Sequence, residues 1–107
     1  MQVQQMTAKQ LKSRLDQGEE LILLDVREPF EFEYASIKGS FNIPMGDIPK
    51  RYVEVSQEQD CVVICHSGIR SRQVVSFLAD NGYQRVFNLQ GGIDQWSLHC
   101  DNTVPRY

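Results

Sequence analysis

Two uninterrupted apolar runs constrain the fold of this chain more than any other feature. Residues 21–24 read Leu-Ile-Leu-Leu, and residues 61–64 read Cys-Val-Val-Ile. Such runs are typical of strands in a parallel sheet, where helices cover both faces and bury each strand on both sides. They predict an α/β domain with a mostly parallel central sheet.

Helical patterns lie between the apolar runs. Thr7 followed by Gln10 forms a capping-box pattern for a first helix, which Gly18 ends. Pro29 suits the first turn of a short helix that runs to about residue 35. Apolar residues at positions 74, 75, 77 and 78 predict a longer helix, which begins at residue 69 or 70 and ends before Gly82.

Shorter elements complete the alternation. Residues 1–6 are interpreted as an edge strand, 41–43 and 85–89 as further strands, 47–53 as a short helix or turn, and a last helix carries Ile93 and Trp96. This order implies right-handed crossovers, about five strands and helices on both faces of the sheet. We expect a single domain over residues 1–107, with a polar and loosely ordered tail at residues 99–107.

Composition excludes several classes of function. A chain of 107 residues fits one compact domain, and its net charge of −3 argues against a general nucleic-acid binder. No apolar run approaches the roughly 20 residues that span a bilayer, and the first six residues lack the features of a secretory signal. We therefore expect a cytoplasmic domain with neither a nucleic-acid nor a membrane partner.

The cysteines and histidines do not form a metal-binding pattern. Cys61, Cys65 and Cys100 contain no Cys-x-x-Cys pair, and His66 and His99 have no ligand-like spacing to them. An odd number of cysteines also disfavours a disulfide scaffold and fits a reducing compartment. No metal site is expected.

Three segments should meet at the carboxyl edge of the sheet, where open α/β sheets form their binding crevice. They are residues 25–27, the loop that begins at Cys65, and residues 90–92. Candidate functional groups that are scattered in the sequence are therefore expected to converge in space.

The loop after residue 64 has the features that activate a cysteine. The thiolate is the nucleophilic form, and a free cysteine, with a pKa of about 8.5, is mostly protonated near neutral pH. Because Cys65 ends a strand and precedes a helix, the N–H groups of residues 66–71 can curl towards its sulfur, and the helix dipole adds to their effect. Gly68 gives the loop backbone freedom, Arg70 adds a cation, and Ser71 can cap the helix or donate to the sulfur.

An isolated cysteine is more often a small buried hydrophobe than a nucleophile. The glycine, arginine and serine at these offsets favour the nucleophile for Cys65. Cys61 and Cys100 lack such surroundings, so we interpret them as strand filling and as a near-terminal thiol. Either of them can alternatively resolve an oxidised Cys65 by disulfide formation.

Four segments resemble the rhodanese family, and they extend over nearly the whole chain. They read Leu-Leu-Asp-Val-Arg-Glu at residues 23–28, Ile-Lys-Gly-Ser-Phe-Asn-Ile-Pro at 37–44, Val-Ile-Cys-His-Ser-Gly-Ile-Arg-Ser at 63–71 and Leu-Gln-Gly-Gly-Ile-Asp-Gln-Trp at 89–96. Each motif alone is weak, whereas four in the family's order are very specific. The chain is thus similar to a single-domain thiosulfate sulfurtransferase.

The resemblance implies a two-step reaction through a persulfide on Cys65. A donor such as thiosulfate supplies its sulfane sulfur, and a thiophilic acceptor (cyanide, a thiol or a partner protein) removes it. No cofactor is implied. A phosphatase or arsenate reductase of the same fold is the rival enzyme, but four residues separate Cys65 from Arg70 and those enzymes carry one more. A module that relays sulfur between proteins is the other alternative.

The resemblance also suggests roles for individual residues. Arg70 would hold the loop and balance the charge of the sulfur. His66 and Ser67 would lie at its mouth and contact the anionic donor, although His66 can equally be a plain exposed loop residue; Gly68, Ile69 and Ser71 complete the loop. Asp25 and Arg27 would either orient the pocket edge or form a structural salt bridge, and Trp96 is interpreted as core.

One departure from the family pattern is visible. Many members carry a Gly-His pair before the isoleucine of the second segment, whereas this chain has Ala35 and Ser36 before Ile37. The departure leaves the expected activity in place and puts the local packing in doubt.

Overall fold

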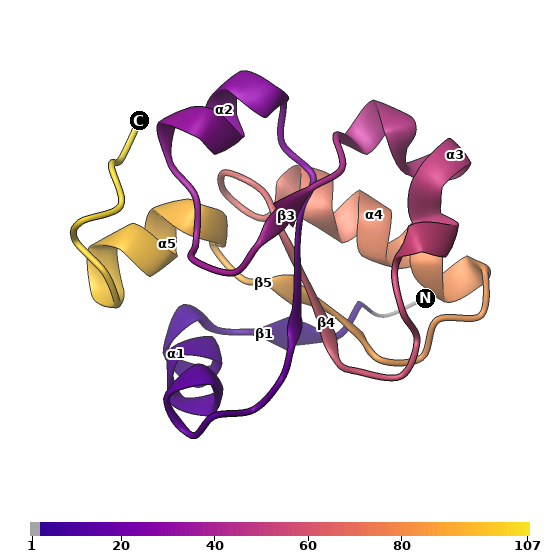
Figure 1. The fold of residues 1–107 in the computed structure, drawn as a ribbon, viewed down its shortest axis with the longest axis horizontal. Coiled ribbons are helices and arrows are strands. Elements are labelled where there is room, and N and C mark those ends of the chain that lie inside the picture. The colour runs from indigo at the N-terminus through magenta and orange to yellow at the C-terminus, as the bar shows by residue number, and fades with distance from the viewer. Residues whose placement is uncertain (1–2) are drawn as a thin grey trace.

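A five-stranded, fully parallel sheet forms the centre of the domain in the computed structural model, which describes residues 3–107 (Figure 1). The order of the strands is β1-β5-β4-β2-β3. Their bounds are Gln5–Met6 for β1, Ile22–Asp25 for β2, Phe41–Asn42 for β3, Cys61–Ile64 for β4 and Val86–Leu89 for β5. The predicted α/β architecture is confirmed, and β1 lies at the sheet edge as expected, although residues 1–2 of that segment fall outside the described part.

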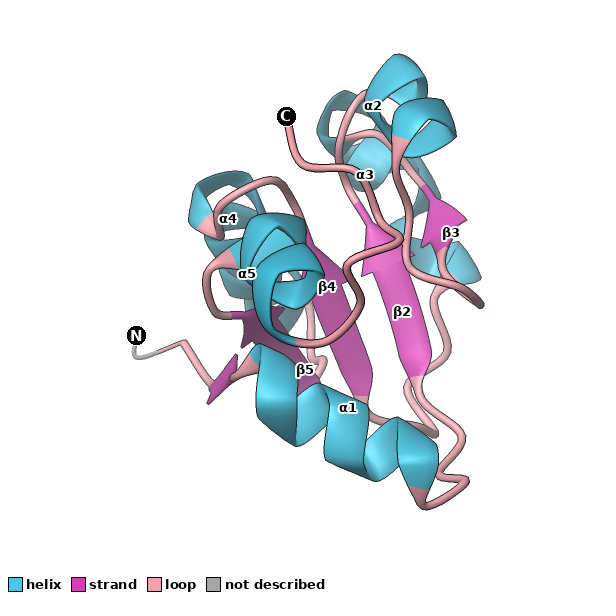
Figure 2. Cartoon of the chain, turned by 90° about the vertical axis from the view of Figure 1, so that its left-hand side faces the viewer, coloured by secondary structure: helices cyan, strands magenta, loops and turns pink. Residues whose placement is uncertain are grey.

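Helices cover both faces of the sheet, as Figure 2 shows. The bounds are Ala8–Asp16 for α1, Pro29–Tyr34 for α2, Ile48–Arg51 for α3, Ile69–Asp80 for α4 and Gly92–His99 for α5, and short 3-10 turns at Met45–Asp47 and Tyr52–Glu54 flank α3. For most of the strands and helices, the predicted and observed bounds differ by one or two residues. Differences of this size are expected, because hydrogen bonding frays at the ends of these elements.

Local sequence signals account for several of these boundaries. The Thr7 side chain accepts from the Gln10 amide at 3.1 Å while the Gln10 side chain accepts from the Thr7 amide at 2.9 Å, so the predicted capping box of α1 is confirmed. Pro29 occupies the first turn of α2, where its missing N–H costs no hydrogen bond. Gly68 precedes α4 with a φ of +101°, a conformation that glycine adopts readily.

Alternate residues of the central strand β4 pack into two separate cores. Val62 and Ile64 face the core that α1 and α5 cover, whereas Cys61 and Val63 face the core that α3 and α4 cover. Burial raises the pKa of the Cys61 thiol to about 12, which leaves it protonated and unreactive. This placement agrees with the interpretation of Cys61 as strand filling.

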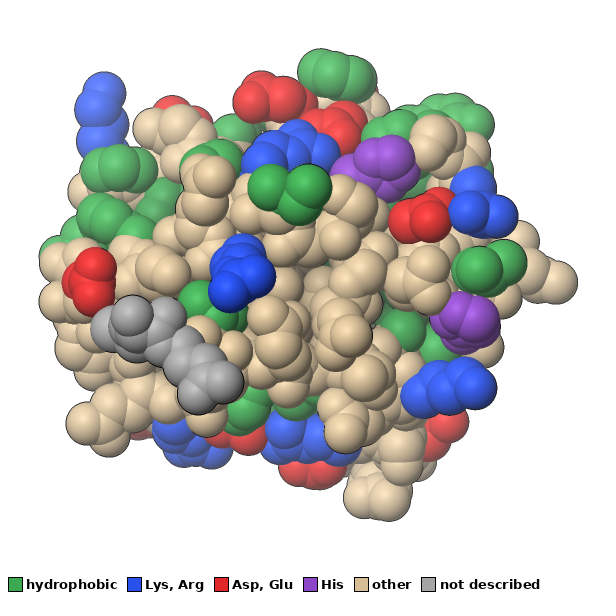
Figure 3. Space-filling view, turned by 180° about the vertical axis from the view of Figure 1, so that it is seen from behind, with side chains coloured by type: hydrophobic (Ala, Val, Ile, Leu, Met, Phe, Trp, Pro, Cys, Tyr) green, Lys and Arg blue, Asp and Glu red, His purple; other side chains and the backbone are tan. Residues whose placement is uncertain are grey.

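Surface composition is mixed. On the face seen in Figure 3, basic and acidic side chains are scattered among hydrophobic side chains and large areas of backbone and other side chains. Within residues 3–107, no helix has the length and apolar character needed to cross a bilayer.

A close backbone contact joins α5 to the cysteine loop. The N–H groups of Ile93 and Asp94 donate to the carbonyls of Cys65 and His66 at 2.9 and 3.1 Å. Gly92 precedes them with a φ of +63°, and a Cβ atom there would lie 2.4 Å from the His66 oxygen and 2.5 Å from the Cys65 oxygen. The second glycine of the Gly-Gly motif therefore lets α5 dock directly under the loop.

Gly92→Ala should lower the free energy of unfolding by about 3 kcal/mol, because it combines an unfavourable φ with a steric clash. Gly82→Ala is the matched control, since Gly82 has a φ of +93° but open space where a Cβ atom would lie. We expect it to cost only about 1 kcal/mol. Denaturant titration of both variants measures the difference, and equal losses would show that the contact under the loop is not tight.

Candidate active site

The structure brings the expected segments together at the carboxyl edge of the sheet. Asp25 at the end of β2 pairs with Ile64 at the end of β4, so the segments that follow both strands emerge side by side. The segment after β5 reaches the same place, because the N–H groups of Ile93 and Asp94 donate to the carbonyls of Cys65 and His66. The predicted convergence of the three segments is confirmed.

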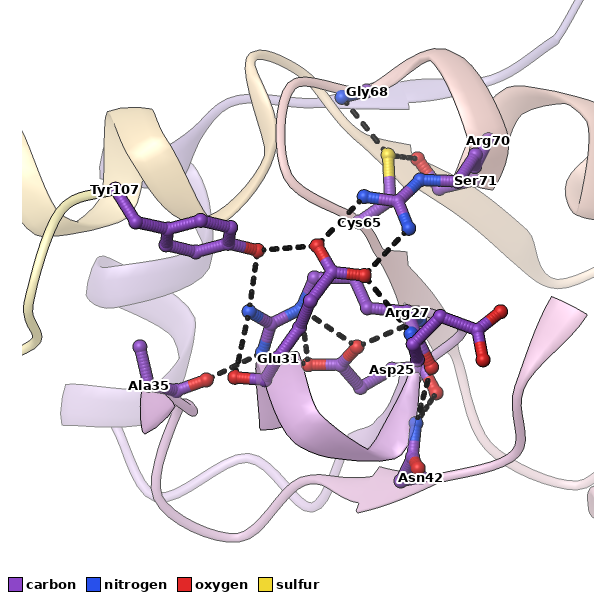
Figure 4. A network of polar contacts seen from close by, with 11 residues as sticks. Asp25, Arg27, Glu31, Ala35, Asn42, Cys65, Gly68, Arg70, Ser71 and Tyr107 are labelled. Carbon is purple, nitrogen blue, oxygen red and sulfur yellow. Dashed lines mark hydrogen bonds and ion pairs between the residues drawn. The ribbon is translucent and has the colours of Figure 1, made fainter. Parts of the chain in front are cut away.

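The sulfur of Cys65 lies inside its loop and is held by two hydrogen-bonding groups (Figure 4). The Gly68 amide donates to Sγ at 3.0 Å, and the Ser71 hydroxyl lies 3.2 Å from Sγ. Cys65 is only 1% exposed. Because α4 begins at Ile69, its amino-terminal dipole lies beside the sulfur and favours negative charge there.

Arg70 makes a bidentate ion pair with Glu31 of α2. Its Nη1 and Nη2 atoms donate to the two carboxylate oxygens of Glu31 at 2.7 and 3.0 Å. The contact raises the pKa of Arg70 and, as the largest of several causes, lowers the pKa of Glu31 to about 2. Arg70, the cation expected to balance the charge of the sulfur, is therefore already paired with the Glu31 carboxylate.

Tyr107 is a second residue that the sequence did not single out. Its hydroxyl donates to Glu31 Oε2 and accepts from Arg27 Nη1, both at 2.8 Å. Its ring stacks on His66, with 4.2 Å between the ring centroids and 13° between the planes. One tyrosine thus links the cysteine loop to α2 and to the segment after β2.

The polar tail that carries Tyr107 packs back against the domain instead of extending loosely as expected. Val104 is buried, and the Ser97 hydroxyl donates to its carbonyl oxygen. Arg106 pairs with Asp94 of α5 at 2.8 Å. Two contacts on α5 therefore direct the end of the chain towards His66.

Asp25 and Arg27 form a fully buried ion pair, with 2.6 Å between Asp25 Oδ2 and Arg27 Nη2. Arg27 also donates to the carbonyls of Glu31, within α2, and of Ala35, directly after it. Neither side chain of the pair has exposed surface, so here they brace α2 against β2 and do not line an open pocket. This geometry matches the structural salt bridge, one of the two roles considered for them.

The departure from the family pattern at Ala35 and Ser36 does not break this bracing. Arg27 reaches Ala35 through the backbone carbonyl, which any residue supplies. Ala35 itself is buried in the core that Ile37 also joins. Ala35 and Ile37 are therefore buried without a histidine between them.

The remaining loop residues lie on different sides of the sulfur. His66 lies against Tyr107, whereas Ser67, Gly68 and Ile69 line an open cleft of about 510 Å³ on the side facing β1 and β5. Ile69 is 70% exposed. Among residues 3–107, no three histidine, cysteine or acidic side chains are grouped so that they could hold a metal ion.

Comparison with known proteins gives the class of the domain. The family model of the rhodanese-like domain matches residues 7–99. A sulfurtransferase of Allochromatium vinosum is 38% identical over 97 residues, which are 91% of each chain. The thiosulfate sulfurtransferase GlpE of Haemophilus influenzae is 31% identical over 105 residues, 98% of this chain and 95% of that one.

A solved structure agrees with these sequence matches. The rhodanese-like domain protein of Staphylococcus aureus superposes with a TM-score of 0.85 at 27% identity, covering 98% of this chain and 99% of that one. The chain belongs to the rhodanese-like family, and its relatives support sulfur transfer as its general activity.

The Glu31–Arg70 pair predicts a pH dependence of stability. Because the folded-state pKa of Glu31 is about 2, against an ordinary 4.5, its stabilisation is complete above about pH 4.5 and is lost as the pH falls towards 2. Glu31→Gln should therefore reduce the loss of unfolding free energy between about pH 6 and about pH 3, as measured by denaturant titration.

Glu54→Gln is the control for that change, because Glu54 forms an exposed ion pair with Arg51. It should keep most of the wild-type pH dependence. An unchanged pH dependence in Glu31→Gln would contradict the assigned contact.

Proposed function

We propose that this domain is a thiosulfate sulfurtransferase that carries sulfane sulfur as a persulfide on Cys65. The observation that carries the proposal is the sulfur itself, buried at the end of β4 and contacted by the Gly68 amide and the Ser71 hydroxyl. The Gly68 amide donates to the sulfur, and such a donor favours the thiolate over the neutral thiol. The thiosulfate sulfurtransferase GlpE, similar over nearly the whole chain, supports thiosulfate as donor.

In the first step, the Cys65 thiolate attacks the outer sulfur of thiosulfate. A bond forms between Sγ and that sulfur, the sulfur–sulfur bond of thiosulfate breaks, and sulfite leaves with the bonding electrons. The negative charge of Cys65 is then on the outer sulfur of the persulfide. Splitting the transfer into two such displacements is nucleophilic catalysis through a covalent intermediate.

The surrounding charges suit an anionic donor. Glu31 alone would repel a dianion, but its bidentate contact with Arg70 neutralises it. His66 and Ser67 follow Cys65 directly and are assigned to contact with the donor, as the family resemblance implies. In this proposal Asp25 and Arg27 act indirectly, by holding α2 and its Glu31 in place.

In the second step, an acceptor attacks the outer sulfur and Cys65 leaves as the thiolate. Cyanide would give thiocyanate, a low-molecular-weight thiol would give a new persulfide, and a cysteine of a partner protein would take the sulfur in the same way. No further redox partner is needed, because the sulfane sulfur passes on at constant oxidation state. We place this reaction in the cytoplasm, where thiol acceptors are kept reduced.

The rival phosphatase activity needs a wider loop. The tetrahedral phosphate group must fit between the nucleophile and the N–H groups that bind it. Here the Gly68 amide already donates to Sγ at 3.0 Å, so the loop closes tightly on the sulfur. This geometry, together with the four residues between Cys65 and Arg70, favours transfer of a single sulfur atom.

Steady-state kinetics with thiosulfate and cyanide test the proposal. Ping-pong behaviour is expected, and Cys65→Ser should abolish thiocyanate formation because the nucleophile is lost. Cys61→Ser and Cys100→Ser are matched controls that should retain it.

Activity in Cys65→Ser would refute the proposed nucleophile. Hydrolysis of a phosphate monoester by the wild-type protein, without sulfur transfer, would favour the phosphatase instead.

A further inference from the structure

A third side chain reaches the reacting cysteine indirectly, through the Ser71 hydroxyl. Asn88 of β5 is 3% exposed, and its Oδ1 accepts a hydrogen bond from Ser71 Oγ. The same Ser71 oxygen lies 3.2 Å from Cys65 Sγ. Three polar groups from β5, α4 and the end of β4 therefore form a short buried chain.

The orientation of the Asn88 amide is fixed by its other contacts. Its Nδ2 donates to the backbone carbonyl of Gly68 at 3.2 Å and to Gln5 Oε1 at 3.0 Å. A backbone carbonyl can only accept, so the nitrogen must face Gly68 and the oxygen must face Ser71. An amide oxygen can also only accept, which means that Ser71 donates its hydrogen to Asn88.

A hydroxyl group has one hydrogen, and Ser71 cannot give it to Asn88 and to the sulfur at once. While Asn88 holds it, Ser71 Oγ presents lone pairs to Cys65, and the contact is satisfied when the thiol donates its own hydrogen. The thiolate has no hydrogen to give. It then faces an oxygen lone pair unless Ser71 turns its hydrogen to the sulfur and leaves the buried Asn88 oxygen without a donor.

We propose that Asn88 is a positioning residue that competes with the Cys65 thiolate for the hydroxyl hydrogen of Ser71. The inference rests on the proposed function and deepens it. Asn88 favours the resting thiol over the thiolate, because only the thiol has a hydrogen for the Ser71 oxygen. In the persulfide, Sγ is the uncharged inner sulfur and the outer sulfur carries the charge, so the Ser71 lone pair is less unfavourable beside it than beside the thiolate. Of these three states, the bare thiolate is the one that the Ser71–Asn88 contact disfavours most, and it is the state that must attack the donor.

Other titratable and charged groups surround this end of the sheet, from the segment after β2, α2, the loop, α4, α5 and the tail. They are Asp25 at the end of β2, Arg27, Glu31, His66, Arg70, Arg72, Asp94 and Tyr107. All of them stay unchanged in the variants below, so their contribution cancels when two backgrounds are compared.

A double-mutant cycle tests the competition. The rate of Cys65 alkylation by iodoacetamide is measured against pH in the wild type, Asn88→Leu, Ser71→Ala and the double variant, with peptide mass mapping to confirm that Cys65 carries the adduct. Asn88→Leu should lower the pH midpoint by about half to one unit, because it frees the Ser71 hydrogen for the sulfur. In the Ser71→Ala background the same change should have no effect.

Two further variants test whether a change in the pH midpoint has only a structural cause. Gln5→Ala removes the other side-chain partner of the Asn88 amide and should leave the midpoint unchanged. Asn88→Ala removes the same acceptor with less bulk and replaces Asn88→Leu if that variant does not fold.

Equal shifts in both backgrounds, or none in the presence of Ser71, would overturn the role of Asn88. The alkylation measurement involves no sulfur donor, so its outcome is independent of the sulfur-transfer assay. A coupled shift without sulfur transfer would overturn the proposed function alone, and transfer without coupling would overturn this inference alone.

Discussion

A sulfur atom that is almost fully buried at the end of the central strand sets the requirements for the rest of the site. Such an atom can carry negative charge only where hydrogen-bond donors and dipoles replace water. The fold supplies the Gly68 amide and the amino terminus of α4. Both lie beside the sulfur because the chain turns tightly after Cys65. That tight turn depends on the docking of α5 beneath the loop, which Gly92 permits.

A chain of alternating charges surrounds the loop on the side away from β5. Asp25 pairs with Arg27, Arg27 donates to Tyr107, Tyr107 donates to Glu31, and Glu31 pairs with Arg70. Each group in this chain has a hydrogen-bonding neighbour of complementary character, a condition that makes such networks rigid. The chain joins the segment after β2 to α2, α4 and the tail, so the surroundings of Cys65 are a property of the whole carboxyl edge.

The sequence was most informative where the physical cause is local. The capping box at Thr7, the apolar strand over residues 61–64 and the loop after Cys65 depend on residues close together in the chain, and each was predicted. The contacts that sequence reasoning missed join distant residues: Arg70 and Glu31 are 39 positions apart, and Tyr107 and Arg27 are 80 apart. The sequence showed that Arg70 is positively charged. It did not show that Glu31 is its partner, because that pairing depends on where α2 lies in the fold. The tail looked loose because it is polar, and Val104 and Tyr107 gave too weak a pattern to indicate packing.

We propose Cys65 as the residue that carries the transferred sulfur, and intact mass spectrometry after exposure to thiosulfate tests this assignment most directly. We expect the protein to gain about 32 Da, the mass of one sulfur atom, and we expect cyanide to remove it. The gain should be present in Cys61→Ser and Cys100→Ser and absent in Cys65→Ser. A gain that persists in Cys65→Ser, or no gain in the wild type at any thiosulfate concentration, would contradict the account.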